Sequence, residues 1–240
     1  MKEHLLDLSS GFTFEKSKVE EYFQIIALDK NKTPVYYIYL KPNYSISEVV
    51  YSRLSEELEL PCVRAFFGTN LKDVNSASDI YSVSSYSHEW KRADENEIKD
   101  KNYYRHRVLY FLFTGAADIE DVFGNIKPDG KFISSHNSKV FSALMLHKLY
   151  LDGKPTSATF ETMDKYDFIL ESKQYGIEEG EDILEKISNL TDEQISKCSL
   201  MPDEIENKSV IEDYLRDKIA STRKLAADCF QLIRDNKGDS

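Results

Sequence analysis

Apolar and polar residues alternate along residues 12–40, on both sides of the polar stretch 29–32. A period of two is typical of strands that bury one face. The pattern therefore predicts a β-hairpin or a small meander in this part of the chain. Residues 79–87 predict one more short strand.

The stretch 36–67 has the order strand, helix, strand. Five strand-favouring residues lead to Lys41, which stands at the end of the first predicted strand. Leu60 and Pro61 end the helix, and residues 62–67 predict the second strand.

The helix between these strands is predicted to start at Ser45, after a turn. Ser45 and Glu48 have the spacing of a capping box, in which two side chains bond the first backbone N–H groups of a helix. Apolar residues recur at every fourth position, so one face of the helix is expected to pack on a sheet: Val50, Leu54 and Leu58.

Lys41 and Glu48 are the first candidates for chemistry. A lysine that binds phosphate needs a partner, because a carboxylate on a neighbouring helix can hold the flexible ammonium in one direction. In the simpler interpretation Lys41 is solvated and Glu48 only caps its helix. The spacing leaves both interpretations open.

Residues 88–100 are polar and highly charged, and they separate two parts of different character. The chain before them is rich in predicted strands, and the chain after them is mostly helical. Because such a stretch has little to bury, we expect a lobe boundary here.

An apolar segment of helix length follows at residues 103–115, and Arg105, His106 and Arg107 stand among its aromatic residues. Basic and aromatic residues together are also found on nucleic-acid-binding faces. In a chain this acidic we favour a buried helix with a polar N-terminal turn.

The remainder of the chain is predicted to be a tight hairpin followed by helices. The hairpin covers residues 126–133. Ser138 is expected to cap an amphipathic helix, and the spacing of Thr191 and Gln194 predicts a capping box further on. Apolar stripes mark the helical tail: Ile183, Leu184, Ile187 and Leu190 in one helix, and Ile211, Leu215, Ile219, Ala226, Cys229 and Ile233 in a long final helix.

The composition is that of a folded, acidic protein. The 240 residues carry a net charge of −11, which argues against general affinity for nucleic acids and anionic membranes. No stretch is apolar enough to span a membrane, and the charged N-terminus does not read as a signal peptide. Cys62, Cys198 and Cys229 lie far apart and are expected to be reduced thiols in a cytoplasmic protein, without metal-ligand spacing.

The negative charge is concentrated towards the C-terminus. From residue 171 to residue 240 there are 17 acidic and 10 basic residues, a difference of −7 out of −11. An acidic surface of this kind can act only to keep the protein soluble, or it can bind a basic protein partner.

Residues 115–141 contain the side chains that phosphoryl transfer uses. Asp118 follows the apolar helix, and Asn125 precedes the hairpin. A carboxylate can orient an attacking hydroxyl, while an Asn and a second carboxylate hold magnesium against phosphates. The same stretch can equally be a polar loop between two elements.

These residues resemble those of a known family. Lys41 and Glu48, with Leu60-Pro61 ending their helix, resemble the small lobe of HipA-like serine/threonine kinases, which are bacterial toxin kinases. The sequence GAAD that ends at Asp118 is similar to the family's G-N-x-D stretch, whose Asp is the catalytic base. Asn125 resembles the metal-binding Asn, and residues 133–138 (ISSHNS) resemble the segment F-D-S-G-N-S. The helical tail resembles the family's C-terminal lobe.

The resemblance implies an α+β, two-lobed protein-kinase-like fold. Residues 1–90 would form a small antiparallel sheet lobe with one helix, and residues 91–240 a mostly helical C-terminal lobe. ATP would lie between the lobes with its phosphates on Lys41, and magnesium would be held by Asn125 and the residue at position 134. The substrate would be a protein hydroxyl, in a component of the translation machinery, and the partner an antitoxin.

The chain also departs from the family pattern. Ile119 and Glu120 replace the Arg-His that follows the catalytic Asp, and the interval from Asp118 to Asn125 is wider than in the family. The second magnesium carboxylate falls on Ser134, a neutral hydroxyl that cannot offset the charge of the ion.

Three hypotheses follow from the sequence. The chain is a pseudokinase that acts by binding another protein, or an active ATP-dependent serine/threonine kinase of the toxin–antitoxin type, or an unrelated α+β binding protein. Activity would require Glu120, Asp121 or Asp129 to replace the missing carboxylate.

Overall fold

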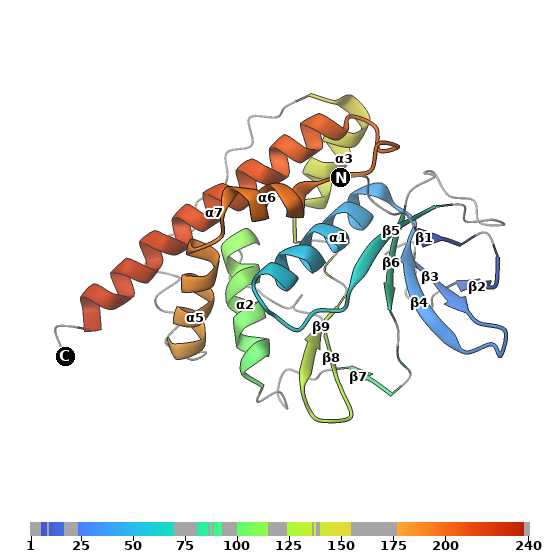
Figure 1. Ribbon diagram of the computed structural model, residues 1–240, viewed down its shortest axis with the longest axis horizontal. Coiled ribbons are helices and arrows are strands. Elements are labelled where there is room, and N and C mark those ends of the chain that lie inside the picture. Colours follow the sequence, from blue (N-terminus) through green and yellow to red (C-terminus); the bar gives the residue numbers. More distant parts are fainter. Residues whose placement is uncertain are drawn as a thin grey trace.

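The computed structural model of the chain describes residues 6–8, 10–16, 24–69, 81–85, 87, 89–92, 100–114, 124–135, 137, 140–154 and 177–237. Two sheets lie on one side of these residues and a group of helices on the other (Figure 1). The larger sheet has the strand order β1-β5-β6-β4-β3-β2. Its strands are β1 (Leu6–Asp7), β2 (Thr13–Lys16), β3 (Gln24–Leu28), β4 (Pro34–Tyr39), β5 (Ala65–Thr69) and β6 (Tyr81–Ser85).

The alternating stretch at the start of the chain forms an antiparallel meander, as its pattern predicts. β2 pairs with β3, and β3 pairs with β4. The strand predicted at 79–87 is β6, which lies between β4 and β5 and is antiparallel to both. β1 is parallel to β5, so this edge of the sheet joins distant parts of the sequence.

The smaller sheet contains the predicted hairpin. It has the order β7 (Lys91–Arg92), β8 (Gly124–Ile126) and β9 (Phe132–Ser134). The turn at 128–130 ends at Gly130, whose φ of 80° suits glycine. An isolated parallel bridge between Cys62 and Ser134 ties this sheet to the segment that follows the first helix.

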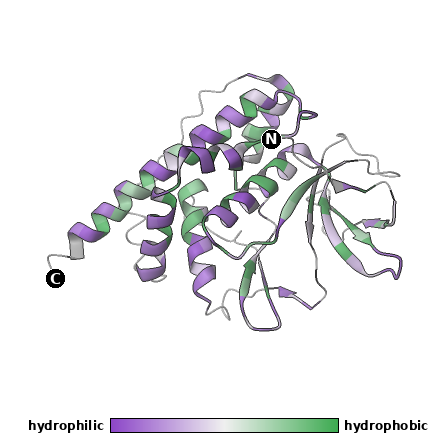
Figure 2. Ribbon diagram, in the orientation of Figure 1, coloured by the Kyte–Doolittle hydropathy of each residue, from purple (hydrophilic) through white to green (hydrophobic). Residues whose placement is uncertain are grey.

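Six helices lie in the described residues. They are α1 (Pro42–Glu57), α2 (Lys101–Thr114), α3 (Ala143–Asp152), α5 (Ile177–Ser188), α6 (Asp192–Ser199) and α7 (Lys208–Lys237). The capping box of Thr191 and Gln194 is present in full at the start of α6, which confirms that prediction. In Figure 2 polar and apolar residues alternate along α7, and all six apolar residues predicted for its buried stripe are buried.

Two predicted helix starts are wrong. α1 begins at Pro42, not after a turn at Ser45, because proline suits the first helical position and Lys41 is the N-cap residue. Ser45 lies inside the helix, and its hydroxyl bonds the sheet instead of the helix start. α3 begins at Ala143 with Ser142 as its N-cap residue, and the predicted cap Ser138 lies outside the described residues.

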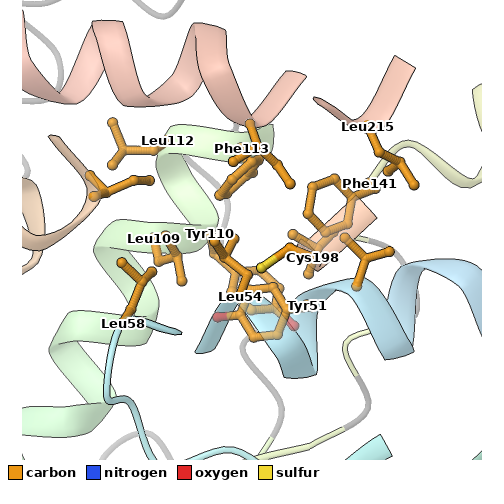
Figure 3. Packing of buried hydrophobic residues seen from close by; sticks show 14 of the residues in the cluster. Tyr51, Leu54, Leu58, Leu109, Tyr110, Leu112, Phe113, Phe141, Cys198 and Leu215 are labelled. Atoms are coloured by element: carbon orange, nitrogen blue, oxygen red, sulfur yellow. The ribbon is translucent and has the colours of Figure 1, made fainter. Parts of the chain in front are cut away.

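α1 lies between the larger sheet and the helices α3 and α6 (Figure 1). Its buried apolar residues belong to one cluster that also includes residues of β5, α2, α3, α5, α6 and α7. Figure 3 shows Tyr51 and Leu54 of α1 among Tyr110, Phe141 and Cys198 from the helical part. A smaller cluster, around Ile38 and Val83, covers the other face of the sheet. The lobe boundary near residue 90 stays a prediction.

Serine side chains join α1 to the sheet. The Ser45 hydroxyl donates to the carbonyl oxygen of Tyr39 in β4 at 2.8 Å and accepts from the N–H of Ser82 in β6 at 2.9 Å. The Ser52 hydroxyl accepts from the N–H of Ala65 in β5 at 3.0 Å. Small residues let the helix approach the sheet closely. Their hydroxyls bond backbone N–H and C=O groups that have no partner in a neighbouring strand.

α2 is a buried helix. This agrees with the interpretation that we favoured over a nucleic-acid-binding face. His106 is fully buried, Arg105 forms an ion pair with Asp182 of α5 at 2.7 Å, and Arg107 donates to the Tyr103 hydroxyl.

None of the described helices combines the length and apolar composition that crossing a bilayer requires. All three cysteines are free thiols.

Candidate functional site

A polar cluster is buried where α1, α2 and the end of β9 meet. Glu48 of α1 lies in it with 1% of its surface exposed. Burial raises the pKa of three neighbouring groups, Tyr51, Cys62 and Tyr110, and the Glu48 carboxylate contributes to each increase. Glu48 is therefore close to groups from α1, from the segment before β5 and from α2.

His106 connects two of these segments. One ring nitrogen, Nε2, lies 2.9 Å from the carbonyl oxygen of Pro61, and Nδ1 lies 2.8 Å from the Tyr51 hydroxyl. A carbonyl oxygen only accepts, so Nε2 carries the proton and Nδ1 accepts from Tyr51. Burial lowers the pKa of His106 to about 4, with smaller opposing effects from Pro61 and Asp100, so the ring is neutral near pH 7.

Asn137 forms hydrogen bonds with several members of the cluster. Its side-chain oxygen accepts from the hydroxyls of Tyr110 and Ser134, and its amide nitrogen lies 3.5 Å from the Cys62 sulfur. Its backbone oxygen accepts from the Ser47 hydroxyl at 2.9 Å. One residue thus binds α1, α2, β9 and the segment before β5.

Ser134 is held from both sides. Its N–H donates to the oxygen of Pro61 at 3.0 Å, and its carbonyl oxygen accepts from the N–H of Val63 at 2.8 Å. Its hydroxyl donates to Asn137 at 2.9 Å, and the residue is fully buried. The position that the resemblance assigns to magnesium is therefore a buried hydroxyl with a hydrogen-bond partner.

Asn125 and Ser134 lie on opposite faces of the hairpin. Asn125 is paired with Ile133, and Gly124 is paired with Ser134, so the alternation of side chains separates the two residues. The amide of Asn125 donates instead to the hydroxyl of Ser135 at 3.0 Å. Ser135, which the sequence did not single out, is the residue that shares a face with Asn125.

Lys41 stands between the sheet and α1, as expected. It is the second residue after the end of β4, is half-buried, and its Nζ lies 5.6 Å from the centre of the Tyr44 ring. The pairing of Lys41 with Glu48 stays a prediction. Asp118, Glu120 and Asp121 lie outside the described residues, so their place relative to this cluster stays a prediction as well.

The donor set at the hairpin is a poor match for magnesium. Asn125 offers an amide, and Ser134 and Ser135 offer hydroxyls that are both buried. Magnesium is usually bound through one or two carboxylates together with substrate phosphates. We therefore derive no catalytic step through a metal ion at these residues.

The other members of the cluster were not predictable from local sequence patterns. Asn137 and His106 act through contacts between segments that are far apart in the chain, which no local pattern encodes. Ser135 had a signal: once the hairpin turn is placed at 128–130, strand alternation puts this residue beside Asn125.

Comparison with known proteins identifies the fold. No protein-family model matches the sequence, and no curated protein matches it either. Among solved structures, the chain is similar to the crystal structure of a Helicobacter pylori proinflammatory kinase, CtkA. The TM-score is 0.57 at 13% sequence identity, and the match covers 95% of this chain and 99% of the other.

This likeness shows a kinase-like fold. It supports the expected mixture of helices with largely antiparallel sheets, and it spans nearly the whole chain. At this level of identity it concerns the fold alone, and it does not extend to the HipA-like family in particular.

Proposed function

We propose that this protein is a pseudokinase, a chain with a kinase-like fold that acts by binding another protein. The neutral contact of Asn125 with Ser135 carries the proposal, together with the enclosed hydroxyl of Ser134. Phosphoryl transfer depends on metal ions that neutralise charge on the phosphates. Loss of one metal carboxylate lowers the rate by roughly a thousandfold.

The free thiols and the acidic helices support two further parts of the proposal. Three unbridged cysteines fit a cytoplasmic protein, since thiols stay reduced there. The concentration of negative charge in residues 171–240 favours a basic protein as the partner. A kinase-like toxin–antitoxin system would supply such a partner as the antitoxin.

One observation favours an active serine/threonine kinase as the second candidate. Lys41 lies at the end of a strand, directly before a helix that buries a carboxylate, Glu48. In that candidate Lys41 binds the ATP phosphates and Asp118 orients a protein hydroxyl. A carboxylate from Glu120, Asp121 or Asp129 replaces the missing magnesium ligand.

Labelled ATP separates the two candidates. Purified protein is incubated with ATP and magnesium beside the variants Lys41→Ala and Asp118→Ala. We expect no label on the protein or on added protein substrates. Label that both substitutions abolish would establish the active kinase and overturn the pseudokinase.

A thermal-shift titration then tests the hairpin. ATP is added with and without magnesium to the wild type, to Ser135→Asp and to the isosteric control Ser135→Asn. Ligand binding raises the melting temperature as ligand excess grows. We expect magnesium to add to the ATP shift only in Ser135→Asp, because only that variant places a carboxylate beside Asn125. A magnesium-dependent shift in the wild type would contradict the proposal.

Site-specific photo-crosslinking tests the protein partner in cells. A crosslinker is placed at exposed positions on the acidic helices, Glu185 of α5 or Asp217 of α7, with exposed Ser85 of β6 as the matched control. We expect a defined adduct from the helices and none from Ser85. Adducts of equal yield from all three positions would argue against a partner on the acidic side.

A further inference from the structure

α1 is tied to the helical part of the molecule at its C-terminal end. The carboxylate of Glu57 forms an ion pair with Lys197 and accepts a hydrogen bond from the amide of Gln194 at 3.0 Å, both from α6. Arg53 donates to the carbonyl oxygen of Leu200, just after α6, at 2.6 Å. Just beyond α1, Glu59 pairs with Lys186 of α5 at 3.2 Å.

Gln194 has two roles in this contact. Its side-chain oxygen closes the capping box of α6 by accepting from the N–H of Thr191 at 2.9 Å, and its nitrogen holds Glu57. The first turn of α6 and the last turn of α1 are therefore held by one side chain. The Glu57 side chain is 14% exposed and that of Lys197 is 63% exposed, so only the carboxylate of the pair is shielded from solvent.

The first half of α1 is tied to the same part of the molecule by buried hydrogen bonds. Ser47 donates to the backbone oxygen of Asn137 and accepts from the N–H of Phe141 at 3.2 Å. One turn later, Tyr51 bonds His106 of α2. On its other side, α1 bonds three strands of the sheet through Ser45 and Ser52.

We propose that α1 is a fixed strut, held along its whole length to the sheet and to the helices at once, with Glu57, Gln194 and Lys197 as the latch at its end. In protein kinases the position of the helix that carries the glutamate controls activity. In α1 of this chain, hydrogen bonds to the sheet and bonds to the helical part of the molecule alternate from Ser45 to Glu57. The site around Glu48 therefore keeps one geometry, and α1 moves only when the core opens. This inference concerns how the fold is held, and it stands whether or not the protein transfers phosphate.

Hydrogen exchange of the full chain, followed by mass spectrometry, tests the strut. Backbone amides open with free energies that range from near zero to that of global unfolding. We expect the amides of α1 to have the protection of the core turns of α7 around Leu215 and Ile219, which are fully buried. A separate, faster opening of α1 would overturn the proposal.

The substitution Glu57→Gln tests the latch. It removes the charge that Lys197 pairs with, and we expect amides in the last turn of α1, from Leu54 on, to exchange about fivefold faster, with those at Ile46–Val50 unchanged. The matched control is Glu56→Gln, one residue earlier, because Glu56 forms its ion pair with Arg64 and Lys197 forms its own with Glu57. Equal exchange in the two variants would show that the latch does not hold α1.

Discussion

The buried imidazole of His106 makes a defined prediction about stability and pH. The ring is fully enclosed by α1, α2 and β9, between Pro61 and Tyr51, with Phe132 at 5.9 Å between ring centres. In the unfolded chain it titrates near its ordinary value of 6.5, whereas burial lowers its pKa in the folded protein to about 4. Acid therefore adds a proton to the unfolded chain first.

The sign and size of the pH effect on the free energy of unfolding follow from the difference between the folded and unfolded pKa of His106. Because the folded pKa is lowered, the contribution to stability is complete above pH 6.5 and is lost as pH falls from 6.5 towards 4. Between pH 7.5 and pH 5 the loss amounts to about 2 kcal/mol, and below the folded pKa it levels off at about 3 kcal/mol.

Urea unfolding at a series of pH values measures this contribution. The wild type is compared with His106→Gln, which keeps a donor for the Pro61 oxygen and does not titrate, and with His147→Gln, which changes an exposed histidine of α3. Acid protonates carboxylates in all three proteins, so the differences isolate the histidine. We expect the stability advantage of the wild type over His106→Gln to shrink by about 2 kcal/mol from pH 7.5 to pH 5. His147→Gln should follow the wild type.

Parallel pH curves for the wild type and His106→Gln would refute the reasoning. They would mean that His106 reaches solvent, or that a negative group compensates its charge in the folded protein.

Three substitutions test the packing that places the site. Ser45→Ala should destabilise the protein by about 2 kcal/mol in urea unfolding, because Ser82 loses a buried acceptor, whereas the exposed Ser85→Ala should not. Gly124→Ala should lower stability by about 3 kcal/mol, since a Cβ there would overlap the ring of Phe132, and an unchanged melting temperature would contradict the packing of the hairpin. Thr191→Ala should cost about 1 kcal/mol through loss of the α6 capping box, and circular dichroism melts will show whether it does.

The parts of the fold that local pattern encodes were predictable from the sequence. The stripe of α7 and the capping box of α6 depend on residues within a few positions of one another, and both are present. The same local reasoning placed the start of α1 too late, because Ser45 and Glu48 have capping-box spacing but face the sheet and the buried cluster. Tertiary contacts decided the role of these two side chains.

The candidate site was predictable only in part, for a related reason. Lys41 and Glu48 were proposed because the predicted strand and helix that carry them are adjacent in sequence, and their pairing stays a prediction. The surroundings of Glu48 come from α2 and from Asn137, which the chain brings in from more than 50 residues away. Strand alternation, applied to the hairpin, separates Asn125 from Ser134 and would have directed attention to Ser135.

The parallel pairing at the edge of the larger sheet has a consequence for synthesis. Leu6 lies opposite Gly68, so β1 leaves the ribosome about 60 residues before the strand that it will bond. Until then its backbone groups have only water as a partner, and closing so long a loop is slow compared with forming a hairpin. β1 therefore joins the sheet only after β5 has been made.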